Sequence, residues 1–418
     1  MASWLHIPTD SDFSLQNLPY GIFSTQNQPD HHIGIAIGDY VLDLNILAQE
    51  NVFDDLGFDA STLEKSTLNV YASLGRSVHR LVRNRVQEIL EKDTDLGALL
   101  KDNQDRRSRC LIKQGDIQLH LPFQIGDYTD FFCGLHHALN GAEIVKPGSS
   151  VEQLCPCFYN LPVAYHGRAS SVVVSGTPFR RPRGQFPVDG KVHSGPTRRL
   201  DFEVEFAAFI ANGNDLGTSI SVDQAEDHIF GFVLLNDWSA RDIQMYEAPI
   251  MGPFGGKNFC TTISPWVVTP EALNSHKTAT MLAKRELPEY LREVKDSAFN
   301  LCIQVDLDCN SGSYTVAKCN TNHVIFSFSQ MIAHHTRVGC PLRTGDLLGT
   351  GTLSGATDEE LGCLLEITKG GKKPREWTSE SGKLERLWLE DGDTIEFTAR
   401  ASDGIGFGSC SGKILPAI

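Results

Sequence analysis

The sequence predicts a mostly β fold with short helices, and three observations support this prediction. Short apolar or alternating runs recur along the chain, as in 172–174, 201–206 and 229–235. Such runs, rich in branched residues or with period two, are typical of strands. Glycine-rich turns separate them, notably in 342–355. The sequence contains no internal repeat and no low-complexity segment, so we expect a globular, mostly β protein.

Length and charge limit the possible functions. The chain has 418 residues, which suggests two or three domains, and 41% hydrophobic with 21% charged residues is ordinary for a globular protein. A net charge of -15 argues against nucleic acid and anionic membranes as partners, but not against a small anionic substrate. No apolar run is long enough to span a bilayer, and Met1–His6 lacks the features of a signal peptide. We therefore expect a cytoplasmic protein.

The cysteines point to the same compartment. There are 11 of them, scattered along the chain. The one close pair, Cys155 and Cys157, has the wrong spacing for a CxxC redox or zinc motif. We expect reduced and mostly buried thiols.

The first 118 residues are predicted to form a structural unit. The segment 32–44 contains two strand-like runs around a Gly-Asp turn, and apolar residues recur at helical spacing between Val78 and Leu90. No cluster of catalytic residue types appears before about residue 118. A charged stretch at 101–107 predicts a linker, after which a larger domain over 119–418 begins.

Acidic residues recur at strand-like positions in that larger part. Glu203 and Glu205 share one face of the alternating run 201–206, about 7 Å apart, and Asp237 ends the apolar run 229–237. Carboxylates this close repel one another unless a cation lies between them, and hard cations prefer such oxygen ligands. From the alternation alone, an exposed strand face with solvated acids is the simpler interpretation.

Other chemistry-bearing residues are individually ambiguous. Asp130 and His137 are seven residues apart, so a helix would place them on one face, although a lone histidine is more often a packing residue. The loop 252–258 carries Lys257 and resembles a phosphate-binding loop, but Met251 and Asn258 occupy positions that such a loop needs for glycine and Ser/Thr.

Six motifs in order make a stronger signal than any one of them. They are IGDYTDF (125–131), YHGRASSVVVSGTP (165–178), DFEVE (201–205), LLNDWSARDIQ (234–244), GPFGGKNF (252–259) and GDLLGTGTLSG (345–355). Together they resemble the fumarylacetoacetase family, and the resemblance runs from about residue 18 to 416. It implies an N-terminal SH3-like β-barrel (1–118), a C-terminal catalytic mixed-sheet β-roll (119–418), a homodimer, and a bound divalent cation, Mg²⁺ or Ca²⁺.

The same resemblance implies roles for individual residues. His137 matches a general base, which Glu366 orients, and Arg241, Gln244 and Lys257 match groups that stabilise an oxyanion. The implied metal residues are Asp130, Glu203, Glu205 and Asp237, with Lys257 and Thr261 also at positions associated with Mg²⁺. The implied substrate-binding residues are Phe132, Lys146, Tyr165, Gln244, Ala248 and Thr352.

The implied reaction is hydrolysis of the carbon-carbon bond of a 1,3-diketo acid, with 4-fumarylacetoacetate of tyrosine and phenylalanine catabolism as the first substrate to test. This chemistry needs a base to deprotonate water, donors for a tetrahedral oxyanion, and a Lewis acid that stabilises the enolate leaving group. A histidine with a carboxylate, an Arg-Gln-Lys set and a carboxylate-held cation meet these three needs.

Three departures from the family pattern leave alternatives open. Phe132, Lys146 and Ala248 stand where the family has Tyr, Arg and Tyr. Lysine keeps the charge of arginine but not its bidentate grip on a carboxylate. A family paralogue that acts on another diketo substrate, as a hydrolase, decarboxylase, isomerase or C–C bond-forming enzyme, remains an alternative. A non-catalytic protein stabilised by Ca²⁺ is a further one, but it has no need of His137 and Glu366.

Overall fold

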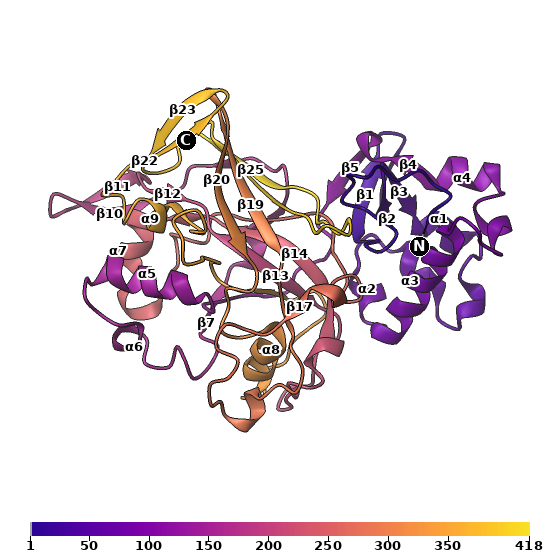
Figure 1. Cartoon of the computed structure of the whole chain (residues 1–418), viewed down its shortest axis with the longest axis horizontal. Helices are drawn as coiled ribbons and strands as arrows, with labels where there is room; N and C mark the ends of the chain where they lie inside the picture. The colour runs from indigo at the N-terminus through magenta and orange to yellow at the C-terminus, as the bar shows by residue number, and fades with distance from the viewer. Residues whose placement is uncertain (1) are drawn as a thin grey trace.

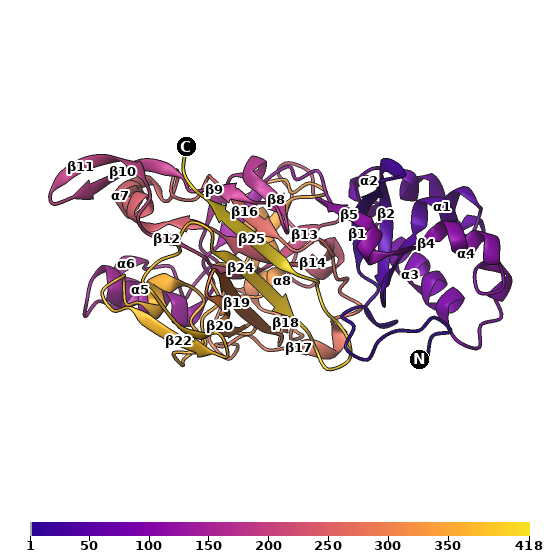
Figure 2. The same ribbon diagram turned by 90° about the horizontal axis from the view of Figure 1, so that it is seen from above.

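The computed structural model describes residues 2–418. Met1, which belongs to the N-terminal segment that lacks signal-peptide features, lies outside the described part. Strands dominate and helices are short, which confirms the mostly β prediction. Figures 1 and 2 show the N-terminal segment grouped at one end of the molecule, beside a larger body that contains the rest of the chain. Within residues 2–418, no helix combines the length and the apolar character needed to cross a membrane.

The N-terminal part contains one five-stranded antiparallel sheet. Its strands lie in the order β4-β3-β2-β1-β5: Leu111–Lys113, Tyr40–Asp43, Gln28–Ile37, Tyr20–Thr25 and Ile117–His120. Strands β2 and β3 flank the turn at Gly38 as predicted. The predicted amphipathic helix is α3 (Arg76–Leu90), which buries Val82, Val86 and Ile89. The other helices here are α1 (Leu44–Gln49), α2 (Asn69–Ala72) and α4 (Gln104–Cys110), with 3₁₀ turns at Asp54–Leu56, Ala60–Glu64, Gly97–Leu99 and Gln114–Asp116.

A mixed seven-stranded sheet is the centre of the larger part. Its order is β7-β6-β21-β13-β14-β16-β8: Ala164–Gly167, Tyr128–Phe131, Leu347–Gly349, Val204–Ile210, Ile229–Asp237, Thr261–Ile263 and Val172–Val174. Two pairs, β6 with β21 and β16 with β8, are parallel, and the other pairs are antiparallel. The strand predicted at Val172–Val174 and the one predicted to end at Asp237 are both present.

A second five-stranded sheet packs on one face of the seven-stranded sheet. Its order is β20-β19-β24-β25-β9: Gly312–Asn320, Cys302–Cys309, Thr394–Ala399, Cys410–Leu415 and Phe179–Arg180. Four small two-stranded sheets complete the β structure: β10 (Arg183–Val188) with β11 (Lys191–Pro196), β12 (Leu200–Asp201) with β15 (Ser239–Ala240), β17 (Lys277–Thr278) with β18 (Ala298–Phe299), and β22 (Arg375–Ser379) with β23 (Gly382–Arg386).

The helices of the larger part lie around these sheets (Figure 1). They are α5 (Leu135–Val145), α6 (Val151–Leu154), α7 (Arg241–Met251), α8 (Phe328–Thr336) and α9 (Leu364–Ile367), with 3₁₀ turns at Ala169–Ser171, Ala225–His228, Asn274–His276 and Glu289–Leu291. Helix α8 ends shortly before Gly339, which adopts a positive φ of 83°.

The alternation at 201–206 does not form one half-exposed strand, so that prediction was wrong in two respects. Strand β12 ends at Asp201 and β13 begins at Val204, so Glu203 lies in the break between them. Strand β13 is also buried on both faces. Phe206 and Ala208 pack in the core between the two large sheets, whereas alternate residues of β13 pack toward the N-terminal sheet. Charged residues at the start of such a strand are therefore withdrawn from water, and the solvated-face interpretation fails.

The helical relationship considered for Asp130 and His137 is not present. Asp130 and His137 do not share a helix, because Asp130 lies in β6 and the chain turns at Gly134 before α5 begins. An alanine Cβ at Gly134 would lie 2.1 Å from the carbonyl oxygen of Thr352, so glycine permits the close approach that this turn requires. Helix α7 begins at Arg241, four residues after Asp237, and extends to Met251.

Candidate active site

Three acidic residues meet at one edge of the seven-stranded sheet because they occupy neighbouring strands. Asp130 of β6 is paired with Gly349 of β21, and β21 pairs with β13, which carries Glu205 near its start. Asp237 is the last residue of β14, the next strand. The acids come from distant parts of the sequence, and the strand order alone brings them together.

The side chains of Asp130, Glu205 and Asp237 form a compact buried cluster. One carboxylate oxygen from each lies within 4.8 Å of the other two, and none of the three residues is more than 4% exposed. Among residues 2–418, Asp130 Oδ1 and Glu205 Oε1 are buried without any hydrogen-bond donor. A buried oxygen without a donor costs free energy. These two oxygens therefore lack the donor or cation that would stabilise them.

Burial and mutual repulsion show in the acidity of the cluster. Burial raises the pKa of Glu205 well above its usual 4.5, and the charges of Asp130 and Asp237 raise it further. Burial likewise raises the pKa of Asp130, and Asp237 adds to this effect. A cation among these oxygens would oppose both effects, because an opposite charge stabilises the ionised carboxylates.

The oxygens of Glu205 approach the backbone of the bend after β21. Gly351 donates its N–H to Glu205 Oε2 at 3.1 Å, and Gly351 has a positive φ of 77°. A Cβ at Gly349 would lie 2.7 Å from the same oxygen. The glycine-rich bend predicted at 342–355 is therefore needed to let the chain approach a buried carboxylate.

Glu203 lies beside the cluster but is paired with two cationic side chains. Its Oε1 lies 2.6 Å from Nη1 of Arg241, and its Oε2 accepts a hydrogen bond from Nζ of Lys257. Burial raises the pKa of Glu203, but Lys257 and Arg241 outweigh this effect and lower the pKa to about 2. Glu203 is thus ionised at any pH at which the protein would function.

Lys257 connects Glu203 to the cluster. Its Nζ also donates to Asp237 Oδ2 at 2.6 Å, and the residue is buried. Burial lowers the pKa of Lys257, but the carboxylates of Asp237 and Glu203 raise it to a net value above 10.5. Asp237 also accepts hydrogen bonds from Thr261 Oγ1 at 3.0 Å and from the Tyr165 hydroxyl at 3.2 Å. Lys257, which gave only a weak signal in the sequence, is therefore hydrogen-bonded to both Glu203 and Asp237.

A histidine and a glutamate form a second buried group. Nδ1 of His137, in the first turn of α5, lies 2.6 Å from Oε2 of Glu366 in α9. Glu366 also accepts hydrogen bonds from Asn140 Nδ2 at 2.8 Å and Ser354 Oγ at 2.8 Å, and it contacts Cys363 Sγ at 3.1 Å. Since the carboxylate can only accept when ionised, the imidazole donates from Nδ1, and in the neutral ring Nε2 is left as an acceptor.

Glu366 remains ionised despite its burial. Burial raises its pKa, but the charge of His137 and hydrogen bonds from His137 and Asn140 outweigh this effect and lower the pKa to about 2. Arg241 contacts Glu203 beside the acidic cluster and also Asp201, whose carboxylate accepts the amides of Leu364 and Leu365 in the helix of Glu366. The two groups thus belong to one site.

Asp201 joins the two groups, and the sequence interpretation did not identify it. Its Oδ2 accepts a hydrogen bond from Nε of Arg241 at 2.8 Å, and its two oxygens accept the backbone N–H groups of Leu364 at 2.7 Å and Leu365 at 2.9 Å. These amides form the start of α9, which carries Glu366. The only sequence signal for this role was the position of Asp201 at the start of the alternating run.

The residues expected to bind substrate are only partly brought together. The ring of Phe132 packs edge-on against His137, with centroids 5.5 Å apart, and Gln244 Oε1 accepts a hydrogen bond from Arg241 Nη1 at 3.2 Å. Thr352 is buried near the start of α5. Lys146 is exposed at the end of α5 and Ala248 is half-buried in α7, and within residues 2–418 neither side chain forms a hydrogen bond or ion pair with the acids.

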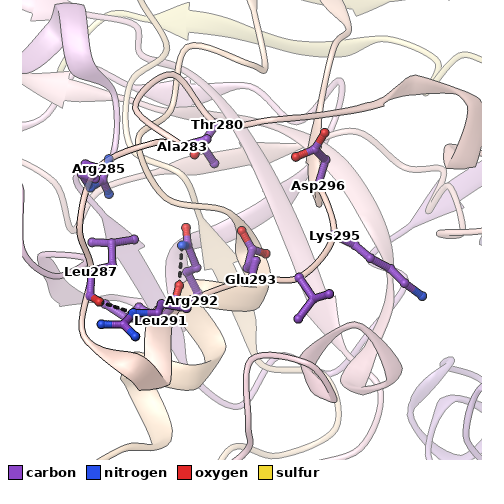
Figure 3. Close-up of a pocket in the computed structure, with 11 residues that line it drawn as sticks. Thr280, Ala283, Arg285, Leu287, Leu291, Arg292, Glu293, Lys295 and Asp296 are labelled. Atoms are coloured by element: carbon purple, nitrogen blue, oxygen red, sulfur yellow. Dashed lines mark hydrogen bonds between the residues drawn. The ribbon is translucent and has the colours of Figure 1, made fainter.

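A cavity of about 310 Å³ lies elsewhere in the larger part. Its wall consists mainly of residues 280–296, with Gln330 of α8 (Figure 3). Arg292 donates to the carbonyl of Leu287 at 2.7 Å, and Gln330 donates to that of Leu291 at 2.8 Å, so the chain around the cavity is internally bonded. None of the expected site residues lines it.

Comparison with known proteins gives matches over nearly the whole chain. Residues 135–415 match the family model described as fumarylacetoacetate (FAA) hydrolase C-terminal, and residues 16–122 match the one described as fumarylacetoacetase N-terminal. The chain is 45% identical to fumarylacetoacetase fahA of Aspergillus fumigatus, with 100% of this chain and 99% of that protein covered. It is 43% identical to fumarylacetoacetase of Caenorhabditis elegans (100% of both) and 41% identical to that of Rattus norvegicus (100% and 99%).

Solved structures show a similar fold. One is the fumarylacetoacetate hydrolase (EaFAH) from Exiguobacterium antarcticum, with a TM-score of 0.54 at 17% identity, covering 96% of this chain and 99% of that one. Another is Cg1458 with inhibitor, with a TM-score of 0.53 at 16% identity, covering 96% and 100%. At this level of identity the likeness concerns the fold.

Proposed function

The chain belongs to the fumarylacetoacetase family, and from this premise we propose that it hydrolyses 4-fumarylacetoacetate to fumarate and acetoacetate. Relatives in fungi, plants and animals that match this chain over nearly their full length are named fumarylacetoacetase. The reaction is the hydrolysis of a carbon-carbon bond in a diketo acid. The observation that best supports this function is the buried His137–Glu366 pair beside a cluster of carboxylates with unpartnered oxygens.

We propose a divalent cation, Mg²⁺ or Ca²⁺, as the cofactor. The donor set fits such an ion, because all candidate ligand atoms are oxygens and two of them are buried without a donor. The ligands would be Asp130, Glu205 and Asp237, with Glu203, whose oxygens are paired with Arg241 and Lys257, as a fourth. Lys257 and Thr261 would hold the carboxylates in place, since both donate hydrogen bonds to them. The ion would supply Lewis-acid stabilisation of the enolate that leaves.

We propose that His137 is the general base. Glu366 fixes the ring by accepting the Nδ1 proton, so Nε2 can take a proton from the attacking water. Ionised Glu366 then stabilises the imidazolium that forms, as expected from its pKa of about 2. Asn140 and Ser354 hold the carboxylate in position through their own hydrogen bonds.

Arg241, Gln244 and Lys257 would stabilise the oxyanion that forms when water adds to the carbonyl. Arg241 is buried, and among residues 2–418 its Nη2 has no hydrogen-bond partner, so this nitrogen can donate to a substrate. Gln244 uses its carbonyl oxygen to accept from Arg241, which leaves its amide N–H groups as donors. Donors held in place before reaction stabilise developing charge most effectively.

The substrate-binding residues are a separate proposal. Tyr165 and Thr352 would contact the diketo acid, together with Phe132, Lys146, Gln244 and Ala248. Phe132 brings an apolar ring edge-on to His137, and Ala248 brings a methyl group. These two side chains favour the second candidate function, a related diketo acid with a larger or more apolar substituent, on which the same base and cation would act.

Incubation with fumarylacetoacetate decides between these candidates. The protein is loaded with Mg²⁺ or Ca²⁺, and the ultraviolet absorbance of the substrate is followed while fumarate and acetoacetate are quantified. Equal amounts of the two products are expected. Carbon dioxide or an isomer as product would indicate one of the alternative family reactions, and no turnover with either cation would indicate another substrate.

We also propose the remaining properties that the family suggests. The chain would divide at residue 118 into an SH3-like domain and a catalytic domain, and two copies would form a homodimer. Ile250 and Met251, which are 91% and 90% exposed at the end of α7, are apolar side chains that a partner would cover. A cytoplasmic location is supported by the eleven cysteines, all of which are unpaired.

A further inference from the structure

A buried thiol lies against the proposed catalytic pair. Cys363 directly precedes α9, and its Sγ is 3.1 Å from Oε2 of Glu366. The same oxygen lies 2.6 Å from Nδ1 of His137. Cys363 is fully buried, Glu366 is 1% exposed and His137 is 7% exposed. The proposed hydrolysis gives no role to this sulfur.

The three side chains match the ligands of a soft or borderline cation. One ligand atom from each of His137, Cys363 and Glu366 lies within 4.8 Å of the other two. Tetrahedral Zn²⁺, with bonds of about 2.0–2.3 Å to nitrogen, oxygen and sulfur, keeps its ligands roughly 3.3–3.8 Å apart. The observed N–O and S–O separations are shorter than this, so the ion would need only a small outward movement of the three side chains.

The acidic cluster differs from this group in chemistry. Asp130, Glu205 and Asp237 offer oxygen atoms alone, which suit Mg²⁺ and Ca²⁺. A group with sulfur and imidazole nitrogen selects Zn²⁺ or Cd²⁺ instead. The two groups lie in one site, since Arg241 pairs with both Glu203 and Asp201, and Asp201 accepts the amides of Leu364 and Leu365 next to Cys363.

We propose that Cys363 Sγ, His137 Nδ1 and a Glu366 oxygen form a second, inhibitory metal site for Zn²⁺ or Cd²⁺. On binding, the thiol releases its proton to solvent and the sulfur bonds to the ion. Nδ1 gives up its hydrogen to bond the ion, and the neutral ring then carries its one N–H at Nε2. The net change is the release of one proton, and the histidine loses the acceptor with which it would deprotonate water.

The first test measures inhibition, and this readout rests on the proposed function. The enzyme with Mg²⁺ in excess is titrated with Zn²⁺, and the residual rate of each protein is compared with its own rate without zinc. Cys363→Ser keeps a donor for Glu366 but removes the sulfur. Since loss of a supporting residue around a metal costs about 10- to 100-fold in affinity, removal of the sulfur ligand should raise the half-inhibitory concentration by about 100-fold. Cys410→Ser, which alters another fully buried thiol, should respond like the wild type.

The second test does not depend on turnover. Co²⁺ replaces Zn²⁺ in such sites, and a cobalt-thiolate bond gives an intense near-ultraviolet charge-transfer absorption. This absorption is expected in the wild type and in Cys410→Ser and is expected to be absent from Cys363→Ser. Cys363→Ala serves in the same way if the serine variant does not fold.

Each outcome bears on the proposal. Equal zinc inhibition of the wild type and Cys363→Ser would place the inhibitory ion at the carboxylates and overturn it, as would an active wild type that zinc does not inhibit. The absence of the cobalt-thiolate absorption from the wild type would overturn the site itself. If fumarylacetoacetate is not turned over at all, the proposed function fails while the cobalt spectra still decide whether the metal site exists.

Discussion

Asp201 and Arg241 form a buried ion pair, with 2.8 Å between Oδ2 and Nε, and the same carboxylate accepts the amides that begin the helix of Glu366. One side chain therefore fixes both the proposed oxyanion donor and the proposed partner of the base. Burial raises the pKa of Asp201, and the charge of Arg241 opposes this effect. Asp201 is a positioning residue for two elements that are distant in sequence.

Asp201→Asn should lower kcat more than it changes KM. The amide keeps the shape of the side chain, but one of its two ends is a donor, so it cannot accept from Arg241 and from both backbone amides. Loss of a hydrogen bond to a charged group costs about 1.5–3 kcal/mol, which corresponds to about a 10- to 100-fold loss of kcat. Steady-state kinetics with the proposed substrate measure both constants.

Asp242→Asn is the matched control for this variant. Asp242 is also buried in α7, but it accepts hydrogen bonds from Thr197 and from the amide of Arg198, not from Arg241. A reduction of kcat in the control equal to that in Asp201→Asn would show that both act through general stability, and the positioning role would fail.

His137→Ala should lower kcat by about 100- to 10,000-fold and leave the content of bound cation unchanged. Removal of a general base costs about 100- to 10,000-fold in rate, and His137 lies outside the group of three acids. Metal analysis of the purified variant accompanies the rate measurement. His136→Ala is the control, since its half-buried ring packs against His323. Full activity of His137→Ala would remove this residue from the mechanism.

Glu205→Gln should have opposite effects on stability with and without a divalent cation. Without the ion, burial and the neighbouring acids raise the pKa of Glu205, so its charge destabilises the folded protein at neutral pH, and the neutral variant should melt at a higher temperature than the wild type. With saturating Mg²⁺ or Ca²⁺ the order should reverse, because the variant loses a ligand and binds the ion at least about 100-fold more weakly. Thermal unfolding with chelator and with cation tests both halves, and parallel shifts in the two conditions would contradict a cation site at Glu205.

Glu366→Gln should reduce stability most at neutral pH. The pKa of Glu366 is about 2 in the folded protein, below the usual 4.5, so its ionised form stabilises the folded state above pH 4.5, and this contribution is lost as the pH falls toward 2. The full contribution is about 3 kcal/mol. The difference in the free energy of unfolding between wild type and variant should therefore shrink by about 1 kcal/mol between pH 6 and pH 3.5. Urea titrations at a series of pH values measure it, and a difference that does not change with pH would show that Glu366 is not held in its ionised form.

The sequence predicted the regular elements better than the contacts among them. The strands at 172–174 and 229–237 and the helix between Val78 and Leu90 followed from local periodicity, which the folded protein retains. The break at Glu203 was not predictable in this way, because it results from the pairing of β12 with β15 rather than from local preference. The helix considered for Asp130 and His137 is absent for a related reason: Asp130 is fixed in a strand by its neighbours β21 and β7.

The site was predicted mainly through the resemblance, and the structure adds what a motif cannot contain. Residue types indicated that acids, a histidine and a lysine belong together, but not that Lys257 and Arg241 both bind Glu203. The role of Asp201 depends on the two amides of Leu364 and Leu365, and backbone groups leave no trace in residue identity.

The parallel pairing of β6 with β21 has a consequence for how the protein is made. Asp127, next to β6, donates its backbone N–H to Oδ1 of Asp346 at 3.0 Å. The two residues are 219 positions apart in the sequence. Synthesis proceeds from the N-terminus, so a nascent polypeptide holds Asp130 with only one of its two neighbour strands, β7, until β21 has left the ribosome, and Glu366 emerges later still. The proposed active site would therefore form only near the end of synthesis. A premature stop before residue 366 would yield a product that lacks Glu366, even if the N-terminal five-stranded sheet had folded.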